Sequence, residues 1–245
     1  MKQTILTVSE NRPLTPTVYR MVLGGDVSAV TASGQFINIK LDGKFLRRPI
    51  SVCDWDAESL TILYKLVGRG TEQMSALPAG TTLDVLTGLG NGFDVFADCK
   101  TPLLIGGGIG SAPLYRLAKE LLKAGKKPAV VLGFNTKEEV FYQDEFAALG
   151  CPVTLATADG SCGVKGFVTD AMRGMDSDYF FACGPEPMLK AVYAASKTSG
   201  QLSFEERMGC GFGACMGCTC KTLTGYKRIC KDGPVLRKEE IIWDA

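Results

Sequence analysis

Residues 102–113 read Pro102-Leu103-Leu104-Ile105-Gly106-Gly107-Gly108-Ile109-Gly110-Ser111-Ala112-Pro113, an apolar run that leads through glycines to a proline. This order predicts a short strand, a tight turn and the start of a helix. Glycines let a pyrophosphate approach the main chain, and the N–H groups of a helix N-terminus can bind it. Pro113 suits the first turn of a helix, where its missing N–H needs no partner. The G-x-G-x-x-P spacing therefore indicates a nucleotide-binding turn, although a plain strand-to-helix connection fits the same residues.

The region around this turn, residues 99–200, alternates between apolar strand segments and amphipathic helical segments. Such alternation predicts a parallel sheet with helices on its faces. No acidic residue is evident about 20 positions after the glycines, where dehydrogenase fingerprints place one. The expected strands are 102–105, 129–132, 153–156 and 179–182, and the expected helices are 112–124, 137–149, 166–174 and 186–197.

A second turn of interest, Phe181-Ala182-Cys183-Gly184-Pro185-Glu186-Pro187-Met188, ends one expected strand and begins the next helix. Ligands bind at the carboxyl ends of the strands in a parallel sheet. The turn is therefore a second candidate for nucleotide contact. The alternative is that Cys183 is a small buried residue of the core.

Residues 1–98 are β-rich, with short strand-like runs separated by glycine-containing turns, which predicts a barrel or a sandwich. Two of the turns suit anions. Arg47-Arg48-Pro49-Ile50-Ser51 offers guanidinium groups and a hydroxyl, and Gly68-Arg69-Gly70-Thr71 begins a short helix. An exposed basic turn and an ordinary helix cap are the alternatives for these two segments.

Residues 201–245 contain five of the ten cysteines, and four of them have a spacing typical of iron–sulfur proteins. Cys210, Cys215 and Cys218 form C-x4-C-x2-C, and Cys230 follows twelve positions later. The first two intervals match the plant-type [2Fe–2S] pattern. A four-cysteine zinc site is the alternative, but such sites usually combine two C-x2-C pairs. Cys220 is expected to be a non-ligand.

Composition narrows the function classes further. The chain of 245 residues has 27 basic and 26 acidic residues, a net charge of +1, so nucleic-acid binding is not expected. It has no histidine, which excludes His-dependent catalysis, His-ligated haem and a Rieske centre. No apolar run suggests a signal peptide or a membrane span, so we expect a cytoplasmic protein. In a reducing compartment, clustered cysteines indicate metal rather than disulfides.

Taken together, these motifs resemble the ferredoxin–NADP reductase superfamily, in which an FAD-binding barrel precedes a nicotinamide-nucleotide domain. The order of barrel, nucleotide domain and short cysteine-rich tail is most similar to the electron-transfer subunits of NAD-dependent (class 1B) dihydroorotate dehydrogenases. The likeness is strongest at Arg48-Pro49-Ile50-Ser51, at Gly68-Arg69-Gly70-Thr71, at Glu206-Arg207-Met208-Gly209-Cys210-Gly211 and at Cys230-Lys231-Asp232-Gly233-Pro234-Val235. The chain departs from that pattern at Thr87-Gly88-Leu89-Gly90-Asn91-Gly92-Phe93, which lacks a proline, and at Lys65, where arginine is common.

The resemblance implies a β-barrel plus an α/β parallel-sheet domain, with a small C-terminal iron–sulfur module. The expected parts are an FAD-binding β-barrel over 1–98, an NAD-binding α/β domain over 99–200 and a [2Fe–2S] module over 201–245. It also implies a catalytic partner that carries FMN and oxidises dihydroorotate in pyrimidine biosynthesis, with two copies of each subunit. Electrons would pass from FMN through the cluster to FAD and then to NAD+, and no acid–base residue of this chain need be catalytic.

The resemblance also assigns site residues. The metal ligands would be Cys210, Cys215, Cys218 and Cys230. The cofactor-binding residues would be Arg48, Pro49, Ile50, Ser51, Leu63, Tyr64, Lys65, Gly70, Thr71, Gly106, Gly107, Gly108, Gly110, Cys183, Gly184 and Pro185.

Three other interpretations remain open at this point. A ferredoxin-fused oxygenase reductase would have a longer cluster domain. A subunit of an NADH-dependent ferredoxin:NADP oxidoreductase would be closer, although some of these have an acidic residue at the position of Cys210. A zinc-stapled nucleotide-binding regulator without a redox role belongs to a different class altogether.

Overall fold

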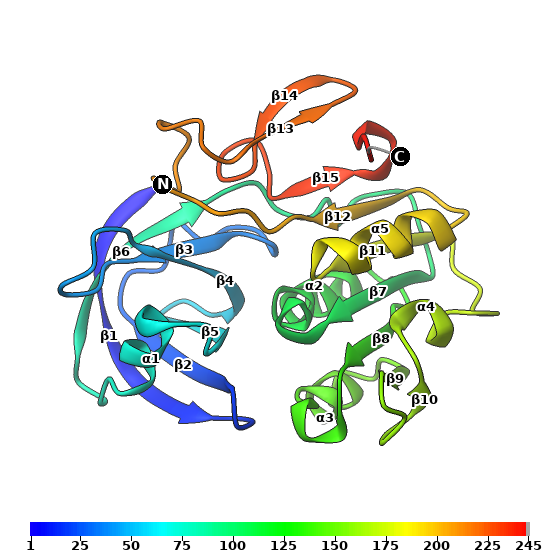
Figure 1. The fold of residues 1–245 in the computed structure, drawn as a ribbon, viewed down its shortest axis with the longest axis horizontal. Coiled ribbons are helices and arrows are strands. Elements are labelled where there is room, and N and C mark those ends of the chain that lie inside the picture. The colour runs from blue at the N-terminus through cyan, green and yellow to red at the C-terminus, as the bar shows by residue number, and fades with distance from the viewer. Residues whose placement is uncertain (244–245) are drawn as a thin grey trace.

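The computed structural model describes residues 1–243, and its N-terminal part is a closed six-stranded barrel (Figure 1). Alternate residues of its strands, such as Leu6 and Val8, point into a buried apolar core, as expected for a period of two. The short helix α1 (Arg69–Ser75) closes one end through the fully buried Met74. The strands, in the order β1-β2-β5-β4-β3-β6, are β1 (Lys2–Pro13), β2 (Val18–Gly24), β3 (Phe36–Ile39), β4 (Arg48–Trp55), β5 (Ser59–Lys65) and β6 (Thr82–Leu89).

The second part is a seven-stranded sheet in the order β10-β9-β8-β7-β11-β12-β15, parallel except for β15. This arrangement confirms the predicted combination of a barrel with a parallel sheet. Its strands are β7 (Pro102–Gly107), β8 (Ala129–Phe134), β9 (Val153–Thr157), β10 (Val164–Lys165), β11 (Tyr179–Cys183), β12 (Gly200–Ser203) and β15 (Val235–Arg237). Its helices are α2 (Ser111–Lys123), α3 (Gln143–Ala148), α4 (Val168–Ala171) and α5 (Glu186–Ala195). Three 3₁₀ turns are Gly108–Gly110, Lys137–Glu139 and Lys238–Glu240.

Two predicted helices are shorter in the structure than the sequence pattern indicates. The continuous helix expected over 137–149 is wrong: a 3₁₀ turn at Lys137–Glu139 is separated from α3 by an irregular segment that ends at Tyr142, whose φ is 63°. The break lets the rings of Phe141 and Tyr142 turn into the core, where both are buried. Packing therefore overrides local helix propensity here. The helix expected over 166–174 is reduced to α4.

The cysteine-rich segment packs onto both preceding parts. Its hairpin, β13 (Thr219–Thr222) and β14 (Gly225–Arg228), lies at the top of Figure 1. The last strand, β15, pairs with β12 and so extends the sheet of the middle region. The predicted boundaries at 98 and 200 stay predictions, and residues 244–245 of the expected C-terminal module lie outside the described part of the chain.

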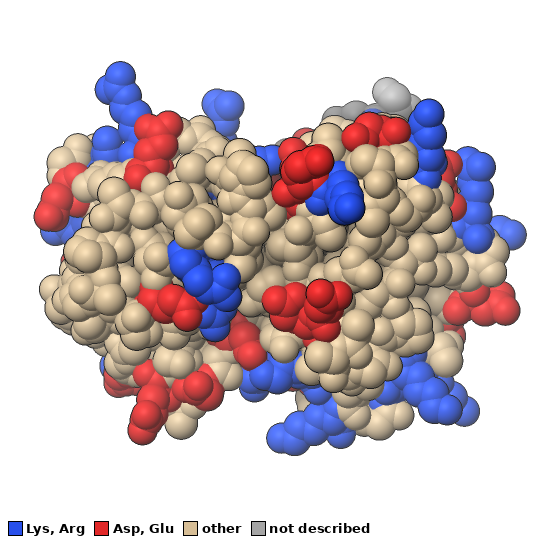
Figure 2. All heavy atoms as spheres, turned by 90° about the horizontal axis from the view of Figure 1, so that it is seen from below, with Lys and Arg blue, Asp and Glu red and all other residues tan. Residues whose placement is uncertain are grey.

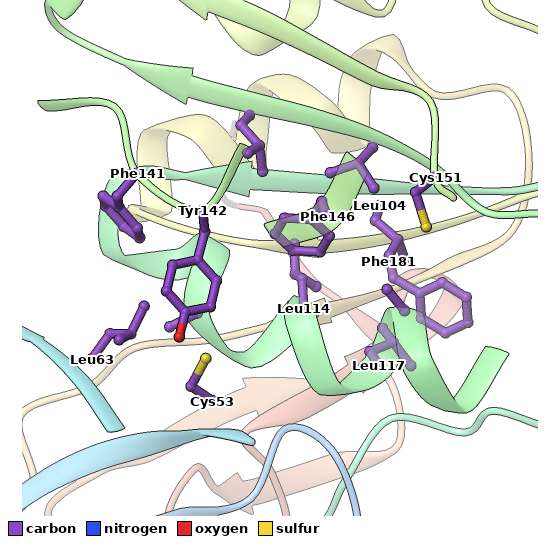
Figure 3. Close-up of a cluster of buried hydrophobic side chains, with 14 of the residues drawn as sticks. Cys53, Leu63, Leu104, Leu114, Leu117, Phe141, Tyr142, Phe146, Cys151 and Phe181 are labelled. Carbon is purple, nitrogen blue, oxygen red and sulfur yellow. The ribbon is translucent and has the colours of Figure 1, made fainter. Parts of the chain in front are cut away.

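The barrel and the α/β part share a packed polar and apolar interface. Arg116 of α2 donates to Asp54 Oδ1 (3.2 Å) and to the carbonyl of Trp55 (2.7 Å), and its guanidinium lies 4.0 Å from the centre of the Trp55 ring. Figure 3 shows the hydroxyl of Tyr142 pointing from the α/β part toward the buried Cys53 of β4. These contacts fix how the two parts face each other.

On one face of the molecule, the charged side chains do not form a field of one sign. On the face shown in Figure 2, acidic and basic groups are interspersed, which agrees with the near-zero net charge. Among the described residues, no helix is long and apolar enough to cross a membrane.

Candidate functional site

A cavity of about 810 Å³ lies where the barrel, the α/β part and the cysteine-rich segment meet. Most of the predicted cofactor-binding residues line it. They are Arg48, Pro49, Ile50, Ser51, Leu63, Tyr64, Lys65, Thr71, Gly107, Gly108, Gly110, Cys183, Gly184 and Pro185.

Gly70 and Gly106, the two other predicted residues, lie behind the wall of this cavity. A Cβ on Gly70 would fall 2.8 Å from Arg48 Cζ, so this glycine makes room for the arginine side chain. A Cβ on Gly106 would fall 2.7 Å from Ser111 Oγ, so this glycine lets the first turn of α2 approach β7. Both positions therefore support the site through close packing.

The barrel side of the cavity carries two basic groups, Arg48 and Lys65. The guanidinium of Arg48 donates to the carbonyl of Leu46 (2.6 Å) and lies over Gly70 at the start of α1. The Thr71 hydroxyl is already used in hydrogen bonds within its own loop, because it accepts from Val67 N (2.9 Å) and donates to Gly68 O (3.0 Å). The barrel therefore offers two cations for phosphate, with Thr71 bracing the turn beside them.

Tyr64 lines the cavity, but its side chain belongs to the barrel interior. Its ring is 1% exposed, and its hydroxyl donates to Asn11 Oδ1 (2.8 Å). Burial raises the pKa of this phenol well above its ordinary value. Tyr64 therefore reaches a ligand mainly through its main chain.

The two turns of the α/β part touch each other at the floor of the cavity. A Cβ on Gly110 would fall 2.6 Å from Cys183 C and 2.7 Å from Gly184 Cα, closer than real Cβ atoms approach main-chain atoms. Glycine is thus required at Gly110 by packing. The helix that follows, α2, begins at Ser111 and has 13 residues, so its N-terminus supplies N–H groups to this floor.

The Cys183 thiol lies at the same floor and behaves as a neutral group. Burial raises its pKa to about 12, although a hydrogen bond from Ser203 partly opposes that rise. Its position at the end of β11 places it among the cavity residues rather than wholly in the core. A ligand here therefore meets an uncharged, soft side chain.

The four predicted metal ligands lie on one curled loop and the turn that covers it. The Cys210 sulfur accepts from Ala214 N (3.2 Å) and Cys215 N (3.4 Å), and the Cys218 sulfur accepts from Cys230 N (3.4 Å). Burial would raise the pKa of Cys210, but main-chain N–H donors outweigh it and lower that pKa to about 6. Such donors stabilise thiolates, which are the form that binds iron.

The thiols are arranged as two pairs, Cys210 with Cys215 and Cys218 with Cys230, each in side-chain contact. Among the described residues, no three Cys, Asp or Glu side chains converge on one point that a single ion could occupy. A cluster of two irons takes two thiolates on each iron. The paired arrangement therefore fits a [2Fe–2S] cluster held by these four residues.

Cys220, the predicted non-ligand, lies in β13. Its side chain is half-buried and lines a small separate cavity of about 200 Å³ with Trp243. Burial raises the pKa of its thiol. These surroundings support a packing role, and its exclusion from the ligand set stays a prediction.

The loop of Cys210 is fixed to the barrel by Asn38 of β3. The Asn38 amide donates to the carbonyl of Cys210 (3.1 Å), and the buried Oδ1 of Asn38 has no partner among the described residues. Gly211, with φ 78°, lets the loop pass over this amide, since a Cβ there would fall 3.2 Å from Asn38 Cγ. The barrel therefore orients the first cysteine of the cluster loop.

Asn91 ties the end of the cysteine-rich segment to the barrel. Its amide donates to Val235 O (2.7 Å) and Asp232 O (3.3 Å), and its Oδ1 accepts from Val235 N (2.9 Å). This residue belongs to the Gly90-Asn91-Gly92 run that lacks the family's proline. Its role is to hold β15 and the turn after Cys230 in place.

We expect Asn91→Ala to lower the free energy of unfolding by about 2 kcal/mol, because partly buried main-chain groups lose their partners. Cluster loss under air should also become faster, since the turn after Cys230 is released. Denaturant unfolding and the decay of visible absorbance measure both effects. Asn91→Asp keeps the acceptor for Val235 N, so its stability and its rate of cluster loss should lie between those of the unmodified protein and Asn91→Ala. Unchanged stability in Asn91→Ala would contradict this role.

Several cavity residues escape the sequence motifs. Some of them follow β12 at the carboxyl edge of the sheet, where ligands bind in parallel sheets. They would have been predicted as site residues if β12 itself had been predicted. Others follow β8 and β10. Among the residues missed are Phe36, Val67, Asn135, Glu139, Phe167, Phe204 and Glu205.

Two family models match the chain. The model described as "Iron-sulfur cluster binding domain of dihydroorotate dehydrogenase B" matches residues 205–242. The model described as "Oxidoreductase NAD-binding domain" matches residues 104–194. These ranges contain the cysteine loop and the two turns at the cavity floor.

Curated relatives are similar over nearly the whole chain. "Dihydroorotate dehydrogenase B (NAD(+)), electron transfer subunit" of Geobacillus sp. (strain WCH70) is 45% identical over 256 residues and covers 99% of each chain. The protein of the same name from Fusobacterium nucleatum is 44% identical, covering 98% of this chain and 99% of its own.

Solved structures share the fold. A chain of an NADH-dependent reduced ferredoxin-NADP oxidoreductase is 32% identical, with a TM-score of 0.89, and the match covers 98% of this chain and 90% of that one. A ferredoxin NADP+ reductase from Neisseria gonorrhoeae with bound FAD and NADP has a TM-score of 0.66 at 20% identity, covering 80% and 90%. The latter shows likeness of fold alone.

Proposed function

The chain belongs to the family of dihydroorotate dehydrogenase B (NAD(+)) electron transfer subunits, and from this premise we propose that it carries electrons from dihydroorotate oxidation to NAD+ in pyrimidine biosynthesis. FAD, a [2Fe–2S] cluster and NAD are its cofactors. When bound, the flavin and the cluster supply the exchange between single-electron steps and hydride transfer. The chain's own residues bind and orient these groups.

One observation carries the proposal: a single cavity joins the predicted flavin turn, the glycine turn and the segment that leads to the cluster cysteines. Arg48 and Ser51 face it from the barrel, Gly107 to Gly110 from the sheet, and Met208 from just before Cys210. Two nucleotides in one cavity can place their rings in contact. Met208, which lines the cavity, is only two positions before Cys210, the first proposed cluster ligand.

The residues divide the work by their chemistry. Arg48 and Lys65 provide positive charge for the flavin phosphates, and the main chain around Gly108 provides N–H donors for the dinucleotide pyrophosphate. The neutral Cys183 thiol and the apolar Pro185 limit water near the reacting rings. No side chain of this set need exchange a proton with a substrate.

The partner is the catalytic subunit of the same dehydrogenase. Its FMN, a complex with two copies of each subunit, and a cytoplasmic location are the finer parts of this proposal. The family resemblance supports the first two, and the ten free cysteines support the third, because a reducing compartment keeps thiols reduced.

The purified chain with its cofactors should oxidise NADH with an artificial electron acceptor but should not oxidise dihydroorotate. This result is expected because the cavity suits nucleotides, whereas the dihydroorotate site belongs to the partner. Steady-state assays with both donors, before and after addition of the catalytic subunit, test the assignment. Dihydroorotate oxidation by the chain alone would overturn it, and so would failure of the added subunit to couple dihydroorotate to NAD+ reduction.

A further inference from the structure

Asn38 of β3 points out of the barrel core and toward the cysteine-rich segment. Its neighbours Ile37 and Ile39 are buried inside the barrel, and successive residues of a strand point to opposite faces. Asn38 therefore shares the outer face of β3 with Phe36, which packs in the same apolar cluster as Cys230. The Asn38 side chain is only 1% exposed. A polar amide is thus buried between the barrel and the segment that carries the cluster cysteines.

The two polar atoms of this amide differ in their surroundings. Nδ2 donates to the carbonyl of Cys210 (3.1 Å), whereas the buried Oδ1 has no hydrogen-bond partner among the described residues. An unpartnered buried acceptor lowers the free energy of unfolding, so an apolar side chain of similar size would suit the packing at least as well. The stability of the fold alone therefore does not account for an asparagine at this position.

Cys210 is the residue through which the Asn38 hydrogen bond can act on a cluster. Its sulfur accepts from the main-chain N–H groups of Ala214 (3.2 Å) and Cys215 (3.4 Å). The main chain at Gly211 lies directly on the Asn38 amide, since a Cβ there would collide with Nδ2. A shift of Cys210 would therefore lengthen the N–H···S hydrogen bonds. Such bonds, together with solvent exposure, set the reduction potential of an iron–sulfur cluster.

The rest of the cluster loop is held by residues of the cysteine-rich segment itself. Arg228 donates to the carbonyl of Gly213 (3.1 Å), and its guanidinium is paired with the Asp232 carboxylate (2.9 Å). These contacts move together with the segment. Among the described residues, the Asn38 hydrogen bond is the one that joins the barrel to residues 210–218. It therefore fixes where the cluster loop lies relative to the barrel.

The main chain of Asn38 belongs to the strand beside the flavin turn. Asn38 lies opposite Pro49 in the β3–β4 ladder, and Pro49 lines the large cavity. Arg47 donates to the carbonyl of Asn38 (3.4 Å) and is anchored by the Asp84 carboxylate (2.9 Å). One residue therefore joins the flavin turn to the first cysteine of the cluster loop.

We propose that Asn38 is a positioning residue for electron transfer: it holds Cys210 in a fixed place relative to the flavin turn and thereby sets the reduction potential of the cluster. The inference deepens the proposed function and rests on it, because it requires a [2Fe–2S] cluster on Cys210. The N–H···S bonds and the positive end of the Asn38 amide dipole both favour the reduced cluster, which carries one more negative charge. Loss of the Asn38 amide should therefore lower the potential.

The test is an anaerobic redox titration of the purified, cofactor-loaded protein, followed by the EPR signal of the reduced cluster. In Asn38→Leu, the ratio of reduced to oxidised cluster at a fixed potential should fall about tenfold, a shift of about 59 mV for a one-electron couple. The thermal unfolding midpoint should change little, because the unpartnered Oδ1 is removed together with the hydrogen bond. Asn38→Ala, which is too small to clash with the loop, should show the same fall in the ratio, and it decides the test if the leucine variant does not fold.

Gln201→Leu is the matched control, because Gln201 of β12 is an equally buried amide with 2% exposure. Its side chain donates to the carbonyl of Asp94 (3.2 Å) and to the hydroxyl of Tyr179 (3.2 Å), and it accepts from Asp94 N (2.8 Å). None of these contacts reaches the cluster loop. The variant should therefore lower the unfolding midpoint while leaving the cluster potential and the EPR signal unchanged.

The outcomes separate the inference from the function on which it rests. An unmodified protein without an iron–sulfur cluster would overturn the proposed function together with this inference. If the cluster is present but the folded Asn38 variants keep its potential, or Gln201→Leu shifts the potential equally, only the inference fails. Loss of the cluster from both Asn38 variants would show a role in assembly instead, and would also overturn the inference alone.

Discussion

Replacing Cys215 by serine should abolish the iron–sulfur absorbance and stop electron transfer from the catalytic subunit to NAD+. Cys215 is an exposed member of the cluster loop, so its substitution should leave the fold intact. Loss of one thiolate leaves an iron with an incomplete ligand set. This should cost more than the 10- to 100-fold loss of metal affinity or activity that is typical when a residue hydrogen-bonded to a ligand is replaced. Visible absorbance, iron content and coupled NAD+ reduction measure the result. NADH oxidation with an artificial acceptor should persist, because the cavity is unchanged.

Cys220→Ser is the matched control, since Cys220 lies in the neighbouring hairpin and faces a different cavity. It should retain iron and coupled activity. Equal loss of the cluster in both variants would show that the ligand set is wrong. Retention of the cluster in Cys215→Ser would do the same.

Gly110→Ala should lower kcat/KM for NADH by about 100-fold while leaving the flavin and the cluster bound. The added Cβ would fall among the main-chain atoms of Cys183 and Gly184, which cannot move aside as a flexible side chain can. The two turns at the cavity floor must then separate, and displacements of about 1 Å in such sites cost about 100-fold in rate. Stopped-flow reduction of the flavin by NADH measures the loss.

Gly24→Ala provides the control for this prediction. Its added Cβ would lie 3.9 Å from Thr7 O and 4.0 Å from Glu58 O, which are ordinary contacts. NADH oxidation should be unchanged. A Gly110→Ala variant that binds and oxidises NADH normally would show that the glycine turn does not form the dinucleotide site.

The features predictable from the sequence are those that depend on local spacing. The G-x-G-x-x-P turn, the Arg48 turn and the cysteine loop each require particular residues within a few positions. The structure places the first two around one cavity, which extends to Met208 just before the cysteine loop. The parallel sheet follows from alternating periods alone. Such motifs can be recognised in the sequence because the close approach of a ligand restricts which residue types can stand at these positions.

Other features depend on contacts between distant segments and escape such reasoning. The pairing of β15 with β12 joins the cysteine-rich tail to the middle sheet, and no local pattern encodes it. Glu139 is not predicted as a cavity residue because the sequence pattern indicates a continuous helix over 137–149, whereas the structure has a 3₁₀ turn there. It also stands 29 positions after Gly110, further than the acidic residue of a dehydrogenase fingerprint.

Metal, sulfide and flavin analysis of the protein purified without air tests the central claim most directly. We expect iron and acid-labile sulfide in equal amounts, about two of each per FAD, with flavin and iron–sulfur bands in the visible spectrum. This result would follow from the paired thiols of Cys210, Cys215, Cys218 and Cys230 and from the nucleotide cavity beside them. Stoichiometric zinc with neither iron nor flavin would contradict the account.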